Sequence, residues 1–189
     1  MPLQKLHTGC RAWPYWVERK FNGVRCFIVV DGPSNRAFAR SGNRLWAGER
    51  AANEIWQRAR PGVYDGELVG ASLPVTLSAV KRADPRGLRF KVFDHLTLGE
   101  WAAGFSCRPL MERRRALADL IQRPGLGLDS VVDVVRGQLI RDAGALAFEA
   151  ARALDRGWEG LVAKDPAAPY ICGDRSWSWL KIKSLEVFG

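Results

Sequence analysis

The chain has 189 residues, of which 47% are hydrophobic, so it is long enough for one domain with a sizeable core. No apolar run approaches the roughly 20 residues that cross a membrane, and the N-terminus lacks the apolar stretch of a signal peptide. The four cysteines are widely spaced and include no C-x-x-C pair, which argues against a zinc site or a disulfide framework. We therefore expect a reduced, soluble, intracellular protein of the cytoplasm, that of the host if the source is viral.

The positive charge is the second bulk feature. Twenty-nine basic residues against twenty acidic ones leave a net charge of +9. Because phosphate contacts release condensed counterions, this balance favours a polyanionic partner. The charge is spread along the chain, with one dense run, Arg113-Arg114-Arg115. On a helix such a run is typical of a solvated face, and contact with a nucleic acid is the alternative.

The first third of the chain is predicted to be rich in β-structure. Strands at 15–20 and 24–30 flank Asn22-Gly23, a dipeptide typical of the two-residue turn of a β-hairpin. A third strand follows at 36–40, and the apolar spacing predicts a helix over 47–58.

The remainder alternates strands with two helices. Residues 109–122 are predicted to be helical, with Pro109 in the first turn, and so are residues 142–156, with Asp142 as N-cap. Strands outnumber helices without regular βαβ alternation, so we predict an α+β domain with mainly antiparallel sheets flanked by helices. The further predicted strands are 63–69, 89–94, 130–140, 160–164 and 178–183.

Five short motifs carry side chains suited to nucleotide chemistry. The first puts the amine of Lys20 at a tight turn, and the second places Asp65 and Glu67 on one face of a strand. Taken singly, each is more typical of a structural element, such as a hairpin turn, a core phenylalanine or an exposed lysine stripe. In chain order they are K-F-N-G-V-R at 20–25, D-G-E-L at 65–68, F-D at 93–94, E-G-L-V-A-K at 159–164 and W-L-K-I-K at 179–183.

In this order the motifs resemble those of the covalent nucleotidyltransferases: ATP-dependent DNA ligases, RNA ligases and mRNA capping enzymes. The resemblance covers about residues 15–183, and Arg40 falls where these ligases carry a further arginine. F-D-H-L at 93–96, followed by P-L-M-E-R-R at 109–114, is similar to a pattern of the DNA-ligase branch. So is the connection between the last two motifs, which contains Tyr170, Gly173, Arg175 and Ser176.

The resemblance implies a single adenylylation domain over 1–189, with a nucleotide-binding groove and Lys20 as nucleophile. Lys20 would attack the α-phosphorus of ATP and form lysyl-AMP. A lysine amine ordinarily has a pKa near 10.4, and cationic neighbours with partial burial favour its neutral form. Lys181, Lys183 and Arg25 are the candidates, and the same charges would neutralise the phosphates.

The resemblance also assigns residues to the base and the ribose. Phe93 would stack on adenine, with Val162 or Leu161 covering the opposite face. Glu18 would lie beside the base, and Glu67 would hold a ribose hydroxyl.

The remaining roles concern phosphate, metal and DNA. Arg25 and Arg40 would contact phosphate, and Glu159, with Glu67 close by, would bind Mg²⁺ or Mn²⁺. AMP would then pass to a 5′-phosphate at a nick in duplex DNA, where the 3′-hydroxyl displaces it. Asn22 departs from this pattern, because the ligases usually carry aspartate there, and the amide lacks the charge.

The chain ends six residues after Lys183, which leaves no room for the OB-fold domain of DNA ligases. We expect either an excised catalytic domain or a minimal monomer that acts with a separate OB-fold or DNA-binding partner. An RNA ligase, a catalytically silent DNA-binding module of the same fold and, less favoured, a capping guanylyltransferase are the alternatives.

Overall fold

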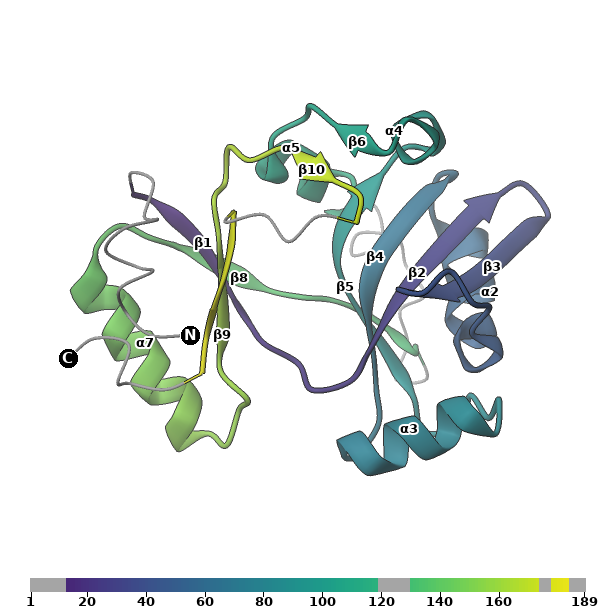
Figure 1. Ribbon diagram of the computed structural model, residues 1–189, viewed down its shortest axis with the longest axis horizontal. Coiled ribbons are helices and arrows are strands. Elements are labelled where there is room, and N and C mark those ends of the chain that lie inside the picture. The colour runs from purple at the N-terminus through teal and green to yellow at the C-terminus, as the bar shows by residue number, and fades with distance from the viewer. Residues whose placement is uncertain (1–12, 119–129, 174–177, 184–189) are drawn as a thin grey trace.

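The fold is built from two main β-sheets whose helices lie outside them (Figure 1). It is seen in a computed structural model that describes residues 13–118, 130–173 and 178–183. Nearly all strand pairs are antiparallel, and β5 with β7 is the parallel exception. The predicted α+β class with mainly antiparallel sheets is confirmed.

The smaller main sheet has the strand order β11-β9-β1-β8. Its apolar face packs on helix α7 (Ala143–Asp155) through side chains such as Val17, Leu146 and Ala163. The register places Glu18 beside Val162, and Val162 beside Lys181, so these three side chains share the opposite face. The strands are β1 (Tyr15–Arg19), β8 (Gly137–Ile140), β9 (Leu161–Lys164) and β11 (Trp179–Ile182).

The larger sheet has the order β3-β2-β4-β5-β7. Its apolar face, including Ile28 and Phe90, packs on helix α2 (Glu49–Arg58), which follows the 3₁₀ turn η1 (Trp46–Gly48). A bulge at Asp65/Gly66 shifts the register between β4 and β5. The strands are β2 (Val24–Asp31), β3 (Ser34–Ala39), β4 (Gly62–Val69), β5 (Arg89–Leu96) and β7 (Val132–Val134).

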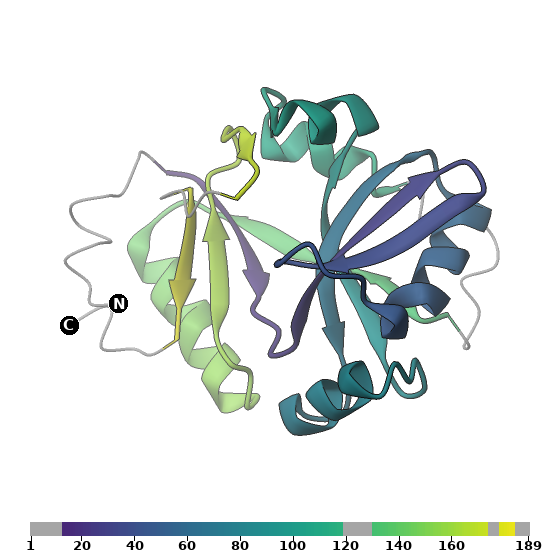
Figure 2. The same ribbon diagram turned by 45° about the vertical axis from the view of Figure 1, so that its right-hand side comes forward.

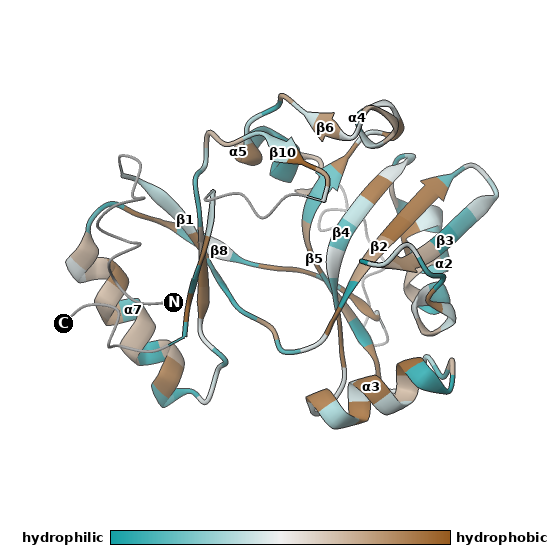
Figure 3. Ribbon diagram, viewed as in Figure 1, coloured by the Kyte–Doolittle hydropathy of each residue, from teal (hydrophilic) through white to brown (hydrophobic). Residues whose placement is uncertain are grey.

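The remaining elements lie on two opposite sides of the molecule. Figure 1 shows α4, α5 and the two-stranded β10-β6 sheet together at the top, and α3 at the bottom; Figure 2 shows the same arrangement. Hydrophobic residues run along β2 and α3 (Figure 3). Within the described residues, no helix is long and apolar enough to span a membrane. These elements are α3 (Leu73–Lys81), α4 (Leu98–Ala103), α5 (Leu110–Arg115), β6 (Phe105–Ser106) and β10 (Tyr170–Ile171).

The predicted hairpin at Asn22-Gly23 is wrong. Both flanking strands form, but β1 pairs with β8 and β9, whereas β2 pairs with β3 and β4. A type I′ hairpin turn needs positive φ at both central residues, and neither Asn22 nor Gly23 has it. The segment therefore crosses from one sheet to the other, and Lys20 lies at that crossing.

Two further predictions need correction. The strand predicted over 130–140 is two strands, β7 and β8, which belong to different sheets. The helix predicted over 109–122 is the short α5, with Pro109 as its N-cap residue; residues 119–122 lie outside the described part. Asp142 is confirmed as the N-cap of α7, where it accepts a hydrogen bond from the Ala145 N–H at 2.8 Å.

Helices α3 and α4 were not predicted, although each has a local start signal. Ser72 caps α3, where Pro74 lies in the first turn. Thr97 and Glu100 form a capping box at α4, in which each side chain bonds the other residue's backbone N–H. Capping signals would therefore have found both.

Candidate active site

Lys20 and Glu159 meet where β1 ends and β9 begins. The Lys20 N–H donates to the Gly160 carbonyl at 2.9 Å, and Lys20 Nζ lies 2.5 Å from Glu159 Oε2. The second carboxylate oxygen, Oε1, lies 2.8 Å from Lys183 Nζ. Burial alone would raise the pKa of Glu159, but the hydrogen bonds from Lys183 and Lys20 outweigh it and lower that pKa.

Gly160 permits this junction. Its φ of +140° is rarely adopted by other residues. A Cβ on Gly160 would lie 2.0 Å from the Ile182 carbonyl oxygen. The close approach of β9 to β11, which brings Glu159 to Lys183, therefore requires glycine at this position.

The crossing segment is bound to β4 beside Lys20. The Gly23 N–H donates to Glu67 Oε1 at 3.0 Å, and a Cβ on Gly23 would lie 2.2 Å from the Leu68 carbonyl oxygen. Burial raises the pKa of the Glu67 carboxyl, and the Gly23 N–H and the charges of Arg25 and Lys20 partly offset this effect. Glu67 thus faces the same space as Lys20.

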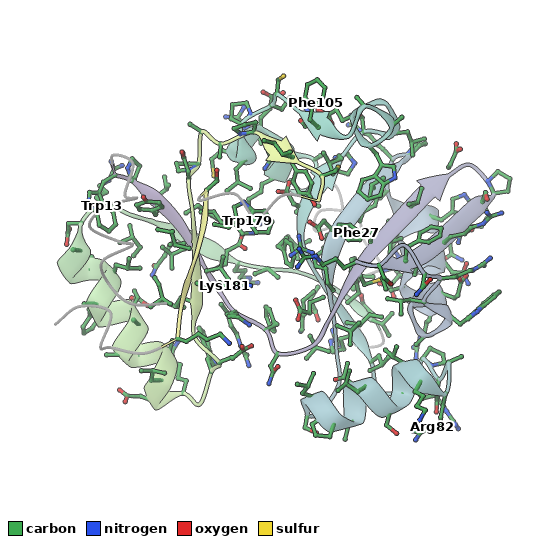
Figure 4. All side chains as sticks on the ribbon, viewed as in Figure 1. Trp13, Phe27, Arg82, Phe105, Trp179 and Lys181 are labelled. Carbon is green, nitrogen blue, oxygen red and sulfur yellow. The ribbon has the colours of Figure 1, made fainter. Side chains whose placement is uncertain are left out.

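Cationic side chains from several strands surround this space. Burial is the largest effect that lowers the pKa of Lys181, and the charges of other cations lower it further. Figure 4 shows Lys181 between the two sheets. A cluster of this kind suits a polyphosphate. The cations acting on Lys181 are Lys20, Lys183, Arg25 and Arg40.

Arg25 is held by a buried carboxylate. Its Nε and Nη2 lie 2.6 and 2.5 Å from the two oxygens of Asp65, and the Tyr170 hydroxyl donates to Asp65 at 2.8 Å. Burial disfavours the charged form of Arg25, but Asp65 prevails and raises its pKa. The guanidinium carbon lies 4.6 Å from the centre of the Phe93 ring. Arg25 thus contacts the ring predicted to stack on adenine.

Phe93 and Trp179 form the aromatic part of the site. Their ring centres are 5.7 Å apart in an edge-to-face arrangement. Lys164 Nζ lies 4.4 Å from the Phe93 centre and 4.2 Å from the Trp179 ring centre. These contacts join the two sheets, because Phe93 belongs to β5, and Lys164 and Trp179 belong to β9 and β11.

The Glu18 carboxylate is buried and engaged by three protein groups. It accepts from Trp16 Nε1 at 2.6 Å, and it lies 2.5 Å from Arg114 Nη1 and 2.6 Å from Lys164 Nζ. Burial lowers the pKa of Lys164, and the Glu18 charge opposes this shift. Glu18 thus joins neighbouring strands to helix α5.

The structure brings most of the predicted site residues together. One group contains the nucleophile candidate and its charged neighbours, and a second contains the aromatic ring and Glu18. Arg40 lies exposed just beyond β3, and its charge is one of those that lower the pKa of Lys181 in the first group. Arg175 and Ser176 lie outside the described residues. The first group is Lys20, Glu67, Glu159, Lys181 and Lys183; the second is Glu18, Arg25, Phe93 and Val162.

Sequence reasoning missed the contributions of Lys164, Arg114 and Asp65 to this region. Lys164 and Asp65 lie inside recognised motifs, so their motif membership was a usable signal. Arg114 lies in the P-L-x-x-R-R match, where the run of three arginines instead suggested a solvated face. That prediction is wrong for Arg113, which is fully buried, and for Arg114, whose side chain is 9% exposed.

The two facing sheets, with a lysine among cations and carboxylates beside an aromatic ring, have the architecture of a nucleotidyltransferase domain. The sequence profile of the ATP dependent DNA ligase domain matches residues 2–183. The chain therefore belongs to the ATP-dependent DNA ligase domain family.

Individual relatives agree with this assignment. The chain is 30% identical to "DNA ligase 1" of Korarchaeum cryptofilum, over 90% of this chain and 33% of the relative. It is 35% identical to a "Probable DNA ligase" of Streptomyces griseus, over 92% of this chain and 36% of the relative. The chain thus spans about one third of the length of these relatives.

Solved structures share the fold. The ATP-dependent DNA ligase of bacteriophage T7, in complex with ATP, superposes with a TM-score of 0.72 at 20% identity, over 96% of this chain and 64% of that one. The Chlorella virus DNA ligase–adenylate gives a TM-score of 0.71 at 19% identity, over 90% of this chain and 62% of that one.

Proposed function

We propose that the chain is the catalytic domain of an ATP-dependent DNA ligase and that Lys20 becomes adenylylated. The contact between Lys20 Nζ and Glu159 Oε2, at 2.5 Å and surrounded by cations, carries this proposal. Family membership supports it, and so does the ATP bound in the T7 neighbour of the same fold.

In the proposed step, the nitrogen of Lys20 attacks the α-phosphorus of ATP. A nitrogen–phosphorus bond forms, the bond from the α-phosphorus to the bridging oxygen of pyrophosphate breaks, and pyrophosphate leaves with the bonding electrons. The amine loses its proton, for which Glu159 Oε2 is the nearest carboxylate acceptor described. Lys181, Lys183 and Arg25 balance the charge of the phosphates.

A divalent cation fits the same carboxylates. Within the described residues there is no cluster of three or more metal-binding side chains, but Mg²⁺ commonly takes one or two carboxylates and completes its shell with phosphate oxygens and water. Glu159 and Glu67 are the residues that would hold it, and Mg²⁺ or Mn²⁺ would supply charge neutralisation at the phosphates. The cation would replace at least one lysine contact of Glu159.

The proposed acceptor is the 5′-phosphate at a nick in duplex DNA, and the 3′-hydroxyl then displaces AMP. The net charge of +9 and the DNA-ligase relatives support DNA as the substrate. We propose that the domain works as a monomer. The relatives are longer than the chain, so they have room for a further DNA-binding domain beside the matched part. Sealing of nicked duplexes that differ only in deoxyribose or ribose at the nick separates DNA ligase from RNA ligase.

Intact-mass spectrometry after incubation with ATP and Mg²⁺ tests the nucleophile. We expect one AMP on the wild-type chain and on Lys81→Ala, a control at an exposed lysine of α3, and none on Lys20→Ala. A wild-type chain without the adduct, or an adduct that persists in Lys20→Ala, contradicts the proposal. Salt-dependent DNA binding without an adduct would instead identify a silent DNA-binding module.

A further inference from the structure

Helix α5 presents two of its three consecutive arginines to the interior. Arg113 is fully buried and the Arg114 side chain is 9% exposed, whereas Arg115 faces solvent. A buried guanidinium is costly unless it is paired and hydrogen-bonded. The partners of Arg113 and Arg114 therefore reveal what each one holds in place.

Arg114 bonds one group in each main sheet and a third in the segment between them. Its Nη1 lies 2.5 Å from Glu18 Oε1 on β1 and donates to the Phe93 carbonyl on β5 at 2.7 Å. Its Nη2 donates at 2.6 Å to the carbonyl of Val135, which lies between β7 and β8. The indole of Trp16 covers the guanidinium, with its ring centre 4.9 Å from the guanidinium carbon.

Helix α5, which carries Arg114, is itself held in place by Arg113. Arg113 Nε and Nη2 each donate to an Asp94 oxygen at 2.9 Å, and both residues are fully buried. Arg113 Nη1 also donates to the carbonyls of Arg108 and Ala168. Helix α5 is thereby anchored to β5 and to the segment after β9, so Arg114 starts from a fixed backbone position.

We propose that Arg114 is a positioning residue that sets the Phe93 ring relative to β1, the strand that leads to Lys20. The inference rests on the proposed function, in which Phe93 stacks on adenine and Lys20 attacks the α-phosphorus. Glu18 precedes Lys20 by two residues, and Phe93 is held through its own carbonyl. One guanidinium therefore determines the separation between β5, which carries the Phe93 ring, and β1, which leads to Lys20.

The planar fork of arginine explains why this residue type is needed. Its donors point in fixed directions and can serve three acceptors at once, whereas a lysine ammonium is a single compact charge on a flexible stem. Lysine at this position would keep the charge beside Glu18 but lose the defined geometry. Arg114→Lys should therefore retain only part of the influence of Arg114 on the position of Phe93.

The experiment compares Arg114→Met with Arg114→Lys and with Arg115→Met, a control at the next, exposed position of the same helix. The ATP dependence of lysyl-AMP formation is measured in single turnovers, at a temperature where circular dichroism shows every variant folded. We expect about a ten-fold higher apparent KM for ATP in Arg114→Met, the order expected for lost hydrogen bonds to a charged group. The apparent KM of Arg114→Lys should lie between those of the wild type and Arg114→Met. That of Arg115→Met should match the wild type.

A purely structural role predicts a different pattern. Loss of folded protein lowers the amplitude of adduct formation and leaves the KM of the remaining active molecules unchanged. An unchanged KM in Arg114→Met, or an equal rise in Arg115→Met, would overturn the inference. If the wild type forms no adduct, the proposed chemistry fails by itself. In that case the affinity of each chain for ATP is compared by calorimetry. An affinity of Arg114→Met equal to that of the wild type, or no ATP binding by any of the chains, would also overturn the inference.

Discussion

Lys20 Nζ and Glu159 Oε2 lie 2.5 Å apart across the junction of β1 and β9. The pairing follows from the backbone, because the Lys20 N–H donates to the carbonyl of Gly160, the residue after Glu159. It gives the proposed nucleophile a fixed position and an adjacent acceptor for its proton.

Replacing Glu159 by glutamine keeps the size of the side chain and removes the acceptor charge. We expect the rate of lysyl-AMP formation to fall about 100-fold or more, the usual range for a lost general acid–base group. Glu149→Gln on α7, where the carboxylate pairs with Arg152 at the surface, is the control. A Glu159→Gln chain that is adenylylated at the wild-type rate in a single-turnover assay would rule out this role.

Gly160→Ala should distort the junction, because the new Cβ would lie 2.0 Å from the Ile182 carbonyl oxygen and φ is +140°. We expect a loss of about 2 kcal/mol or more in the free energy of unfolding and slower lysyl-AMP formation. Gly99→Ala in α4 is the control, since nothing lies within 4 Å of its added Cβ; it should be neutral or stabilising by up to about 1 kcal/mol. Equal free energies of unfolding for the two variants in urea titrations would show that Gly160 is not required at this junction.

The Asp94–Arg113 pair is completely buried, so removing one partner leaves an uncompensated charge. Arg113→Met should lower the free energy of unfolding by about 3–5 kcal/mol. The double variant with Asp94→Asn should lose less than the sum of the two single losses. Arg152→Met, at a surface pair, should cost less than about 1 kcal/mol. Strict additivity in urea unfolding would show that the two side chains do not interact.

His95 makes stability depend on pH. Burial, assisted by the charge of Arg108, lowers its pKa to about 4 from 6.5. The unfolded chain therefore binds more protons between these values, and the folded chain loses stability as pH falls from about 6.5 towards 4. Between pH 7 and pH 5 the loss should be about 2 kcal/mol, from the linkage relation and these pKa values.

His95→Phe should remove this part of the pH dependence. The ring packs edge-on against Tyr64, with centres 4.9 Å apart, so a phenyl ring suits the site. Urea titrations at pH 5, 6 and 7 on both chains provide the measurement. Parallel pH profiles for wild type and His95→Phe would assign the dependence to other groups.

Local patterns in the sequence correctly predicted much of the framework. Alternating apolar residues located most strands within a few residues, and Asp142 marked the start of α7, because strand alternation and helix capping depend on near neighbours in the chain. The motifs likewise identified Lys20, Glu67 and Glu159 by residue type and order, and the structure places them in one region.

Pairing between distant segments was beyond such patterns. The dipeptide Asn22-Gly23 is typical of a hairpin turn. The strands β1 and β2 nevertheless belong to different sheets, because each pairs with strands far along the chain. Arg114 is a second example, because its local sequence predicts a surface position. It is buried because Glu18 and the carbonyls of Phe93 and Val135 come together around it.

Local patterns thus predicted where most strands run and which residues form the candidate site. The choice of strands that share a sheet, of charges that are buried and of the ion pairs they form depends on the three-dimensional arrangement of the chain. A hydrogen-bonded strand partner or a counter-ion comes from residues tens of positions away, and neither produces a periodic pattern in the local sequence.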